Sequence, residues 1–350
     1  MSALLDLLFV VAAVFLLFVF LSVEFGSVSN GLNTILHLIG MGSGIANNLG
    51  NYTTLAIKPP AINQSTLANY ALQLINNDRA KYGLAPVTLT VEPSAQQHAE
   101  SMLQGGYFSH WDLYGMKPYM RYTLVGGNGS VTENLAYEYA SECGVLGCTG
   151  SVNPNESLQK MEYNMMYNDS ICCNNGHRDN ILDPNHNQVS IGVAYNSSTV
   201  YLVEDFVDSY IFWTANTPAY GSNGETYLEG RLSPGYALSQ VYVSYDPVLQ
   251  NFTAKTVPSG PYSYGTDVAG IVSSSMYYYK NLSTIVADTY STSGSAFNVE
   301  FSMKKLIANY GAGEYTVMLI LNDSGGSSFT GATYTIFINQ QGTQYIPKYV

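Results

Sequence analysis

The middle of the chain combines helical and strand-like hydrophobic patterns. Apolar residues recur at helical spacing in three places, and Gly83 marks the end of the first predicted helix. The three predicted helices and the two predicted strands that follow cover Leu67–Ile75, Pro93–Gly105, Leu158–Met166, Val189–Tyr195 and Val200–Val207. Helices mixed with a few strands predict an α+β layered domain over residues 65–213.

Residues 214–350 show a different pattern, because the helical period disappears there. Short alternating runs, separated by Gly, Ser, Pro and Asn, occur at Thr226–Leu232, Gln240–Tyr245, Thr284–Thr289, Phe297–Met303, Tyr315–Leu321 and Thr333–Ile338. Several short strands with turn signals between them predict an all-β sandwich. The stretch Gly313–Val317 resembles the late strand of many Ig-like surface domains.

The first segment is almost wholly apolar from Leu4 to Val23. Twenty such residues match the thickness of a bilayer's hydrocarbon core, which predicts a membrane anchor within residues 1–25. A cleaved signal peptide, which would make the protein secreted, is the alternative, but it needs a basic first region and no Lys or Arg precedes Lys58. Residues 26–64 are rich in Gly, Asn, Ser and Thr and are predicted to form a stalk.

Composition favours an extracellular protein and argues against nucleic-acid binding. Only 11% of residues are charged, and 13 Lys and Arg stand against 25 Asp and Glu, so no basic stripe is available for phosphate. The 13% aromatic content excludes a disordered chain. Nine N-x-[ST] sequons are candidates for glycosylation: Asn51, Asn63, Asn128, Asn155, Asn168, Asn196, Asn251, Asn281 and Asn322.

The four cysteines, Cys143, Cys148, Cys172 and Cys173, are clustered and even in number, which predicts two disulfides. Of the three pairings, the one that joins Cys143 to Cys148 and the adjacent Cys172 to Cys173 is strained and is expected least. Both other pairings tie the loop near 145 to the loop near 172. A metal site built from all four cysteines is disfavoured, because adjacent cysteines chelate one tetrahedral ion poorly.

The residues with chemical potential form a dispersed constellation within residues 65–210. In chain order its blocks are Ile75-Asn76-x-x-Arg79, Gly83-Leu84-Ala85-Pro86, Gln97-His98-Ala99-Glu100, Tyr107-Phe108-Ser109-His110, Thr132-Glu133-Asn134-Leu135-Ala136 and Gly176-His177-Arg178-Asp179-Asn180-Ile181-Leu182. This order of blocks resembles the CAP superfamily of cysteine-rich secretory proteins, antigen 5 and pathogenesis-related 1 proteins (the SCP domain), in its prokaryotic branch.

The resemblance implies an α-β-α sandwich with a central cleft, where two histidines and one or two acids meet. Carried over by motif, these residues are His110, Glu133 and His177. The second acid belongs to a helix before the last histidine, where this chain is enlarged. Glu162 is the best candidate by distance, and Asn164 or Asp169 could take the position. A structural role for Glu133, holding loops through hydrogen bonds, is the alternative to a role in the cleft.

Two imidazoles and a carboxylate suit Zn²⁺ or another divalent cation, with His110 and His177 as ligands. The predicted fold class is therefore α+β: a CAP-like α-β-α sandwich, then an Ig-like β-sandwich, after an N-terminal transmembrane helix. The predicted function is an extracellular, membrane-anchored binding module for a divalent cation, or for a small lipid, peptide or glycan. A metal-dependent hydrolase with Glu133 as base is one alternative, and an adhesive envelope protein is the other, so catalysis stays open.

Overall fold

The computed structural model describes residues 64–140, 143–144, 147–148, 150–275 and 283–348. All of them belong to one compact unit, Ile57–Val350. The predicted anchor, the predicted stalk, and the sequons at Asn51, Asn63 and Asn281 lie outside the described residues. Within the described ranges, no helix is both long enough and apolar enough to cross a bilayer.

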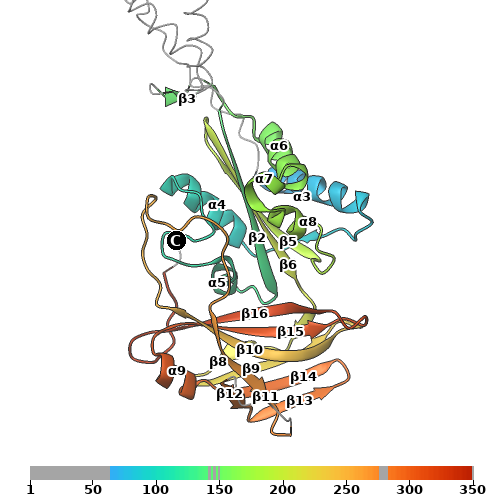
Figure 1. The fold of residues 1–350 in the computed structure, drawn as a ribbon, viewed down its shortest axis with the longest axis vertical. Helices are drawn as coiled ribbons and strands as arrows, with labels where there is room; N and C mark the ends of the chain where they lie inside the picture. The colour runs from blue at the N-terminus through green and yellow to red at the C-terminus, as the bar shows by residue number, and fades with distance from the viewer. Residues whose placement is uncertain (1–63, 141–142, 145–146, 149, 276–282, 349–350) are drawn as a thin grey trace, which may run out of the picture. The chain divides into compact units, whose positions relative to one another are not determined.

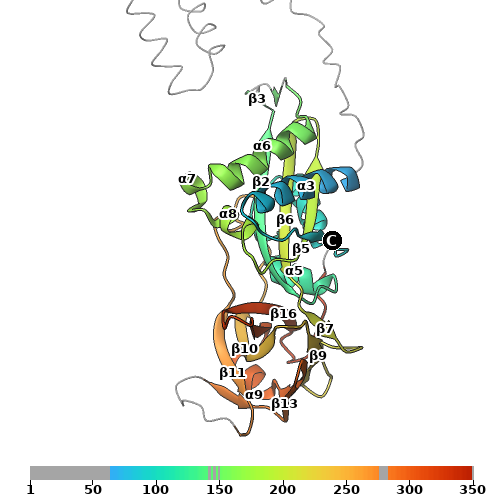
Figure 2. The ribbon, with the colours of Figure 1, turned by 90° about the vertical axis from the view of Figure 1, so that its right-hand side faces the viewer.

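The first part of the described chain is a four-stranded sheet between two layers of helices (Figures 1 and 2). The strands lie in the order β1-β5-β6-β2, with β1 parallel to β5 and the other pairs antiparallel. The strands are β1 (Thr88–Leu89), β2 (Ser130–Tyr139), β5 (Gln188–Tyr195) and β6 (Thr199–Asp208). The helices are α3 (Gln64–Lys81), α4 (Ser94–Gly105), α5 (Pro118–Leu124), α6 (Pro154–Tyr167), α7 (Ser170–Cys173) and α8 (Gly176–Ile181).

Local sequence signals explain where these helices begin and end. The Asn153 side chain accepts a hydrogen bond from the Asn155 amide at the start of α6, and Pro154 occupies the first helical position. Helix α4 ends at Gly106, whose φ of 63° lies in the left-handed region that glycine adopts without strain. The three predicted helices are thus present. Helices α3 and α6 are longer than their apolar patterns indicated, and α4 covers almost the range that was predicted.

Each strand of this sheet buries alternate side chains against the helices on its two faces. Leu135, Tyr201 and Val203 pack with α4, whereas Leu202 and Phe206 pack with α3 and α6. Because side chains alternate along a strand, neighbouring residues of β2 face opposite layers. This alternation places consecutive polar residues of the edge strand β2 on opposite sides of the sheet.

The remaining chain forms two five-stranded sheets around one apolar core. One sheet has the order β12-β11-β10-β15-β16, and the other has β13-β14-β9-β7 with β8 paired to β9. Their bounds are β7 (Ile211–Trp213), β8 (Ala219–Tyr220), β9 (Glu225–Leu232), β10 (Ala237–Pro247), β11 (Thr266–Val272), β12 (Thr284–Val286), β13 (Thr289–Ser293), β14 (Ala296–Ser302), β15 (Gly313–Asn322) and β16 (Ser328–Ile338). Helix α9 (Lys304–Tyr310) precedes β15. The predicted β-rich C-terminal part is present, and its assignment as Ig-like stays a prediction.

The segment between β10 and β11, residues 248–265, packs against the helix-containing part and is called the β10–β11 connection below (Figure 1). The Phe252 amide donates to the Leu113 carbonyl at 2.7 Å, and the Ser109 hydroxyl donates to the Pro258 carbonyl at 2.6 Å. At the end of β10, Asp246 accepts from Lys117 and from the Tyr119 hydroxyl, each at 2.7 Å. The C-terminal sheets therefore contribute directly to the surroundings of His110.

Candidate functional site

His110 and Glu133 form a charged cluster with Arg121. His110 Nδ1 lies 2.8 Å from Glu133 Oε1, and Arg121 Nη2 donates to Glu133 Oε2 at 2.6 Å. The Glu133 and Arg121 side chains are fully buried, whereas 17% of the His110 side chain is exposed. Burial acts to raise the pKa of Glu133, but Arg121, His98 and His110 together outweigh burial and hold this pKa at about 2. Glu133 is therefore an ionised anchor at neutral pH.

Tyr262, on the β10–β11 connection, covers this cluster. Its ring centroid lies 5.0 Å from that of His110, and its hydroxyl oxygen accepts a hydrogen bond from the Glu133 amide at 3.1 Å. Burial raises the pKa of Tyr262 well above its ordinary value, so the phenol stays neutral. No local sequence signal predicted this residue, because its partners lie more than a hundred positions earlier in the chain.

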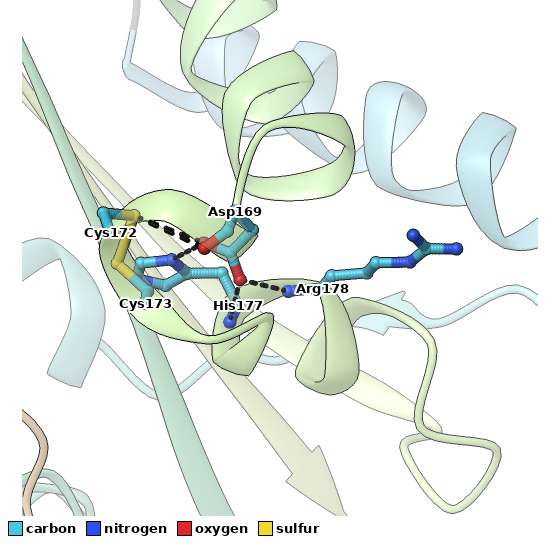
Figure 3. Close-up of a disulfide and its surroundings, with 5 residues drawn as sticks. All are labelled: Asp169, Cys172, Cys173, His177 and Arg178. Carbon is cyan, nitrogen blue, oxygen red and sulfur yellow. Dashed lines mark hydrogen bonds and ion pairs between the residues drawn. A yellow bond between two sulfur atoms is a disulfide. The ribbon is translucent and has the colours of Figure 1, made fainter.

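His177 is held by Asp169 in a similar way (Figure 3). His177 Nδ1 lies 2.6 Å from Asp169 Oδ1, and Asp169 Oδ2 accepts from the His177 and Arg178 amides at 2.8 and 3.2 Å. The Asp169 side chain is 1% exposed and that of His177 is 17% exposed. Asn174 and Asn175, both with left-handed φ, turn the chain so that α8 begins beside Asp169.

The acid that holds His177 is Asp169, whereas Glu162 was the first choice from the sequence. Glu162 instead lies on the buried face of α6, beside Glu204 of β6. Burial first, and then the neighbouring Glu204, raises the pKa of Glu162 well above its ordinary value. Glu204 has a raised pKa through burial as well. The enlarged stretch before His177 explains the error, because distance along the chain does not show where the chain turns back.

The two histidines approach the edge strand β2 from its two faces. Glu133 points to the α4 side, where it pairs with His110. Asn134 points to the other side, where its amide donates to the His177 carbonyl at 3.0 Å and accepts from Asn180 at 2.9 Å. The two residues of one motif thus position one histidine each.

Each of the two histidines offers a ring nitrogen, the donor type that divalent transition-metal ions such as Zn²⁺ take from imidazole. In each ring Nδ1 is engaged by a carboxylate, which leaves Nε2 as the nitrogen that can bind a ligand. Carboxylate-oriented imidazoles are the usual form of metal-binding histidine. Within the described residues, a different set of possible metal ligands lies close together. One donor atom from each of four residues lies within 4.8 Å of the others: Asp169, Cys172, Cys173 and His177.

The expected disulfide pairing is corrected by the structure. Cys172 and Cys173 are joined to each other, although this vicinal pairing was the one expected least (Figure 3). Cys143 and Cys148 are register partners in the short ladder of β3 (Cys143–Gly144) and β4 (Gly147–Cys148). Because Cys172 and Cys173 are joined to each other, neither is bonded to Cys143 or Cys148.

The family match agrees with the motif order. The model of the cysteine-rich secretory protein family, CAP, matches residues 72–217. The chain is similar to an extracellular protein containing an SCP domain from Bacillus anthracis, with 17% identity, a TM-score of 0.32, and coverage of 42% of this chain and 41% of that one. It is also similar to the CAP domain of enterococcal PrgA, with 17% identity, a TM-score of 0.29, and coverage of 41% and 61%.

Each of these alignments spans less than two thirds of the solved chain. The comparison with curated proteins gives no match. The family match begins within α3 and covers the sheet with both of its helical layers, which is the region that carries His110, Glu133 and His177. This chain therefore contains, at residues 72–217, a domain of the cysteine-rich secretory protein family, CAP.

Proposed function

We propose that the CAP domain of this chain is a binding module that takes a divalent cation, with Zn²⁺ as the best fit, through Nε2 of His110 and of His177. The observation that carries the proposal is the shared arrangement of the two rings. Each imidazole is 17% exposed, and each has its Nδ1 on a carboxylate that is buried almost completely. Such pairing fixes the ring and makes the free nitrogen a better ligand.

Zn²⁺ held by two imidazoles would leave positions for water or for an organic ligand, and the ion would polarise whatever occupies them. Glu133 and Asp169 act from behind the ligands by orienting His110 and His177. Arg121 keeps Glu133 ionised, so that His110 has a permanent acceptor. A lipid, peptide or glycan as the second ligand stays a prediction from the sequence.

The properties of Glu133 favour binding over the hydrolase alternative. A general base works best when its pKa lies near the working pH. The pKa of Glu133 is about 2, and its two oxygens already face His110 and Arg121. Glu133 therefore accepts a proton poorly, and its role in this proposal is to position His110.

Calorimetric titration of the full, oxidised chain with Zn²⁺ tests the proposal. Micromolar or tighter binding is expected, and His110→Ala or His177→Ala should weaken it by about 10-fold or more. His186→Gln is the matched control. His186 is also paired with a carboxylate, Asp208 at 2.7 Å, but its Nε2 faces the Thr132 hydroxyl at 3.1 Å. Absence of Zn²⁺ binding by the folded wild type would contradict the proposal.

The same proposal locates the protein outside the cell, held by the apolar segment Leu4–Val23. Support comes from the secretory family match, from the disulfide, which is typical of oxidising compartments, and from the sequons. Among the described sequons, Asn322 is half-buried and the others are exposed: Asn128, Asn155, Asn168, Asn196 and Asn251. Labelling of intact cells with an amine reagent that cannot cross membranes should modify the protein, and deletion of residues 4–23 should release it.

A further inference from the structure

The segment from Asp169 to His177 gathers four donors of three chemical kinds (Figure 3). One carboxylate oxygen, two sulfur atoms and one imidazole nitrogen all lie within 4.8 Å of one another. Cys172 Sγ lies 3.6 Å from Asp169 Oδ1, which in turn lies 2.6 Å from His177 Nδ1. All four donors come from nine consecutive residues in the pattern D-x-x-C-C-x-x-x-H. The cysteine spacing had suggested only a site of four cysteines, and this mixed set of donors was not predicted from the sequence.

We propose that reduction of the Cys172–Cys173 disulfide turns this segment into a metal site that holds one Zn²⁺-like ion through Asp169, Cys172, Cys173 and His177. Two thiolates, an imidazole and a carboxylate are the ligand types that Zn²⁺ takes in tetrahedral sites. Ligand atoms around such an ion lie about 3.3–3.8 Å apart, given its usual bond lengths. The observed group is already close to this size, and opening the disulfide frees the sulfur atoms to separate.

The objection that adjacent cysteines chelate poorly applies to a site made of cysteines alone. Here adjacent sulfurs need to fill only two positions, because Asp169 and His177 supply the other two. The ion inserts between sulfur atoms that the disulfide already holds together. Asp169 is fixed in place independently of any ion, since its second oxygen accepts from the His177 and Arg178 amides. A nearly fully buried carboxylate that is oriented in this way is a preorganised ligand for a cation.

The switch between the two states is a thiol–disulfide exchange. Two molecules of a small thiol reduce the Cys172–Cys173 bond, and the products are two cysteine thiols and the disulfide of the small thiol. Binding of the divalent ion then displaces the two thiol protons to solvent, so the ion carries two thiolate ligands. Cys172 is exposed, which gives the reductant access to the bond. The oxidised chain has no thiolate to offer at this position.

This site is separate from the proposed function, although both use His177. The reduced site engages Nδ1 of His177, and the cation of the proposed function engages Nε2. His110 takes no part in the reduced site. Variants of His110 and of the two cysteines therefore distinguish the failure of one proposal from the failure of the other.

The test uses Co²⁺ as a spectroscopic probe of the full chain, reduced with a phosphine that is then removed without oxygen. The reduced wild type should show a thiolate-to-cobalt charge-transfer band that saturates at one equivalent, and the oxidised protein should not. Replacement of both cysteines, Cys172→Ser with Cys173→Ser, should abolish the band. Asp169→Asn should weaken binding by about 10-fold or more. The band should persist in His110→Ala, and in the control Cys143→Ser with Cys148→Ser.

A second measurement needs no variant and so does not depend on the folding of one. One equivalent of Zn²⁺ should protect Cys172 and Cys173 of the reduced wild type from alkylation, while Cys143 and Cys148 react as before. Absence of the band in the reduced wild type, its persistence without Cys172 and Cys173, or equal alkylation with and without Zn²⁺ would overturn the inference. One result would separate the two proposals. If the reduced protein shows the cobalt band but the oxidised protein binds no Zn²⁺, this inference is upheld and the proposed function is contradicted.

Discussion

At the scale of single residues, Glu133 is the most constrained group of the candidate site. It carries a buried negative charge that Arg121 neutralises, and its other oxygen lies 2.8 Å from His110 Nδ1. Removing one partner of such a pair leaves the other charge buried without compensation. Glu133 is therefore needed for stability as well as for the orientation of His110, so the two roles weighed from its sequence motif coexist.

The substitution Glu133→Gln should lower the free energy of unfolding by about 3 kcal/mol or more, because the Arg121 charge stays buried. Urea unfolding measures this loss. Glu138→Gln, on the same strand, is the matched control: Glu138 pairs with Lys160 at the surface, where about 0–1 kcal/mol is expected. If the two variants lost the same free energy of unfolding, burial of the Glu133–Arg121 ion pair would not contribute to stability.

The pH dependence of stability follows from the buried carboxyls Glu162, Glu204 and Asp205. Burial raises the pKa of each above its ordinary value. Between about pH 5 and pH 8 these groups keep protons in the folded chain that the unfolded chain has lost, so a rise in pH favours unfolding. Urea midpoints should therefore fall from pH 5 to pH 8, and Glu162→Gln should reduce the slope. Glu133 affects stability in the opposite direction, because its pKa is lowered in the folded chain. The stability that it contributes is lost as pH falls from about 4.5 towards 2.

Constant midpoints, or midpoints that rise with pH over this window, would contradict the assignment of protonated carboxyls to Glu162 and Glu204 between α6 and β6 and to Asp205 beside Ser94 of α4. The control is Glu156→Gln, which changes an exposed carboxyl on the same helix. This variant should leave the slope unchanged.

At the scale of elements, the contact between the β10–β11 connection and the loop before α5 depends on one glycine. Gly115 has a φ of +89°, and a Cβ added there would lie 2.7 Å from the Gln250 carbonyl oxygen. Any other residue would be strained in its backbone and would push the connection away. Gly115 has no chemical function of its own, but it allows the β10–β11 connection to pack over His110.

Gly115→Ala should destabilise the protein more than Gly126→Ala does. Gly126 has nearly the same φ, +88°, but nothing lies within 4 Å of an added Cβ. Both substitutions carry a backbone penalty of about 1–2 kcal/mol, so the difference between them isolates the contact with Gln250. Urea unfolding gives the difference, and limited proteolysis of residues 248–265 should be faster in Gly115→Ala. Identical behaviour of the two variants would mean that the connection is not held there.

Elements with strong local signals could be predicted from the sequence, and those fixed by tertiary contacts could not. Helices α3, α4 and α6 have apolar periodicity together with caps or stop residues. Strand β2 was missed because its burial does not alternate: as an edge strand it buries polar Glu133 and Asn134 on opposite faces. The short α5, seven residues long, has too few positions to show a helical period.

Some residues of the candidate site could likewise be predicted from the sequence, and others could not. His110, Glu133 and His177 could be found because each lies in a short motif. Arg79 also lies in one of these motifs, and its guanidinium donates to the carbonyls of Ala85, Ile181, Asp183 and His186. Tyr262 could not be found, because only the folded chain brings it to His110. Asp169 was one of several candidates until the turn at Asn174 and Asn175 placed it.

At the scale of the whole described chain, the CAP domain and the C-terminal sheets share polar contacts. Asp246 accepts from Lys117 and Tyr119, and Trp213 Nε1 donates to the Asn128 carbonyl at 2.9 Å. The Thr333 amide of β16 also donates to the Gly129 carbonyl at 3.1 Å. These contacts predict that the two parts unfold together. A fragment that ends near residue 213 would also expose His110, because it lacks Tyr262.

The two tryptophans of the chain test this cooperativity, since Trp111 lies between α4 and α5 and Trp213 lies in β7 of a C-terminal sheet. Urea unfolding followed by fluorescence in Trp111→Phe and Trp213→Phe variants reports each part separately. Coincident midpoints are expected. Asp246→Ala should separate them by removing the acceptor of Lys117 and Tyr119, and separate midpoints in the parent variants would contradict a cooperative unit.

The cation that we propose lies between His110 and His177. Anomalous diffraction at the zinc absorption edge, from crystals of the oxidised protein grown with Zn²⁺, tests it most directly. We expect one anomalous peak at about 2.0–2.1 Å from Nε2 of both histidines. A protein that binds Zn²⁺ only elsewhere, or shows no peak beside these two rings, would contradict it.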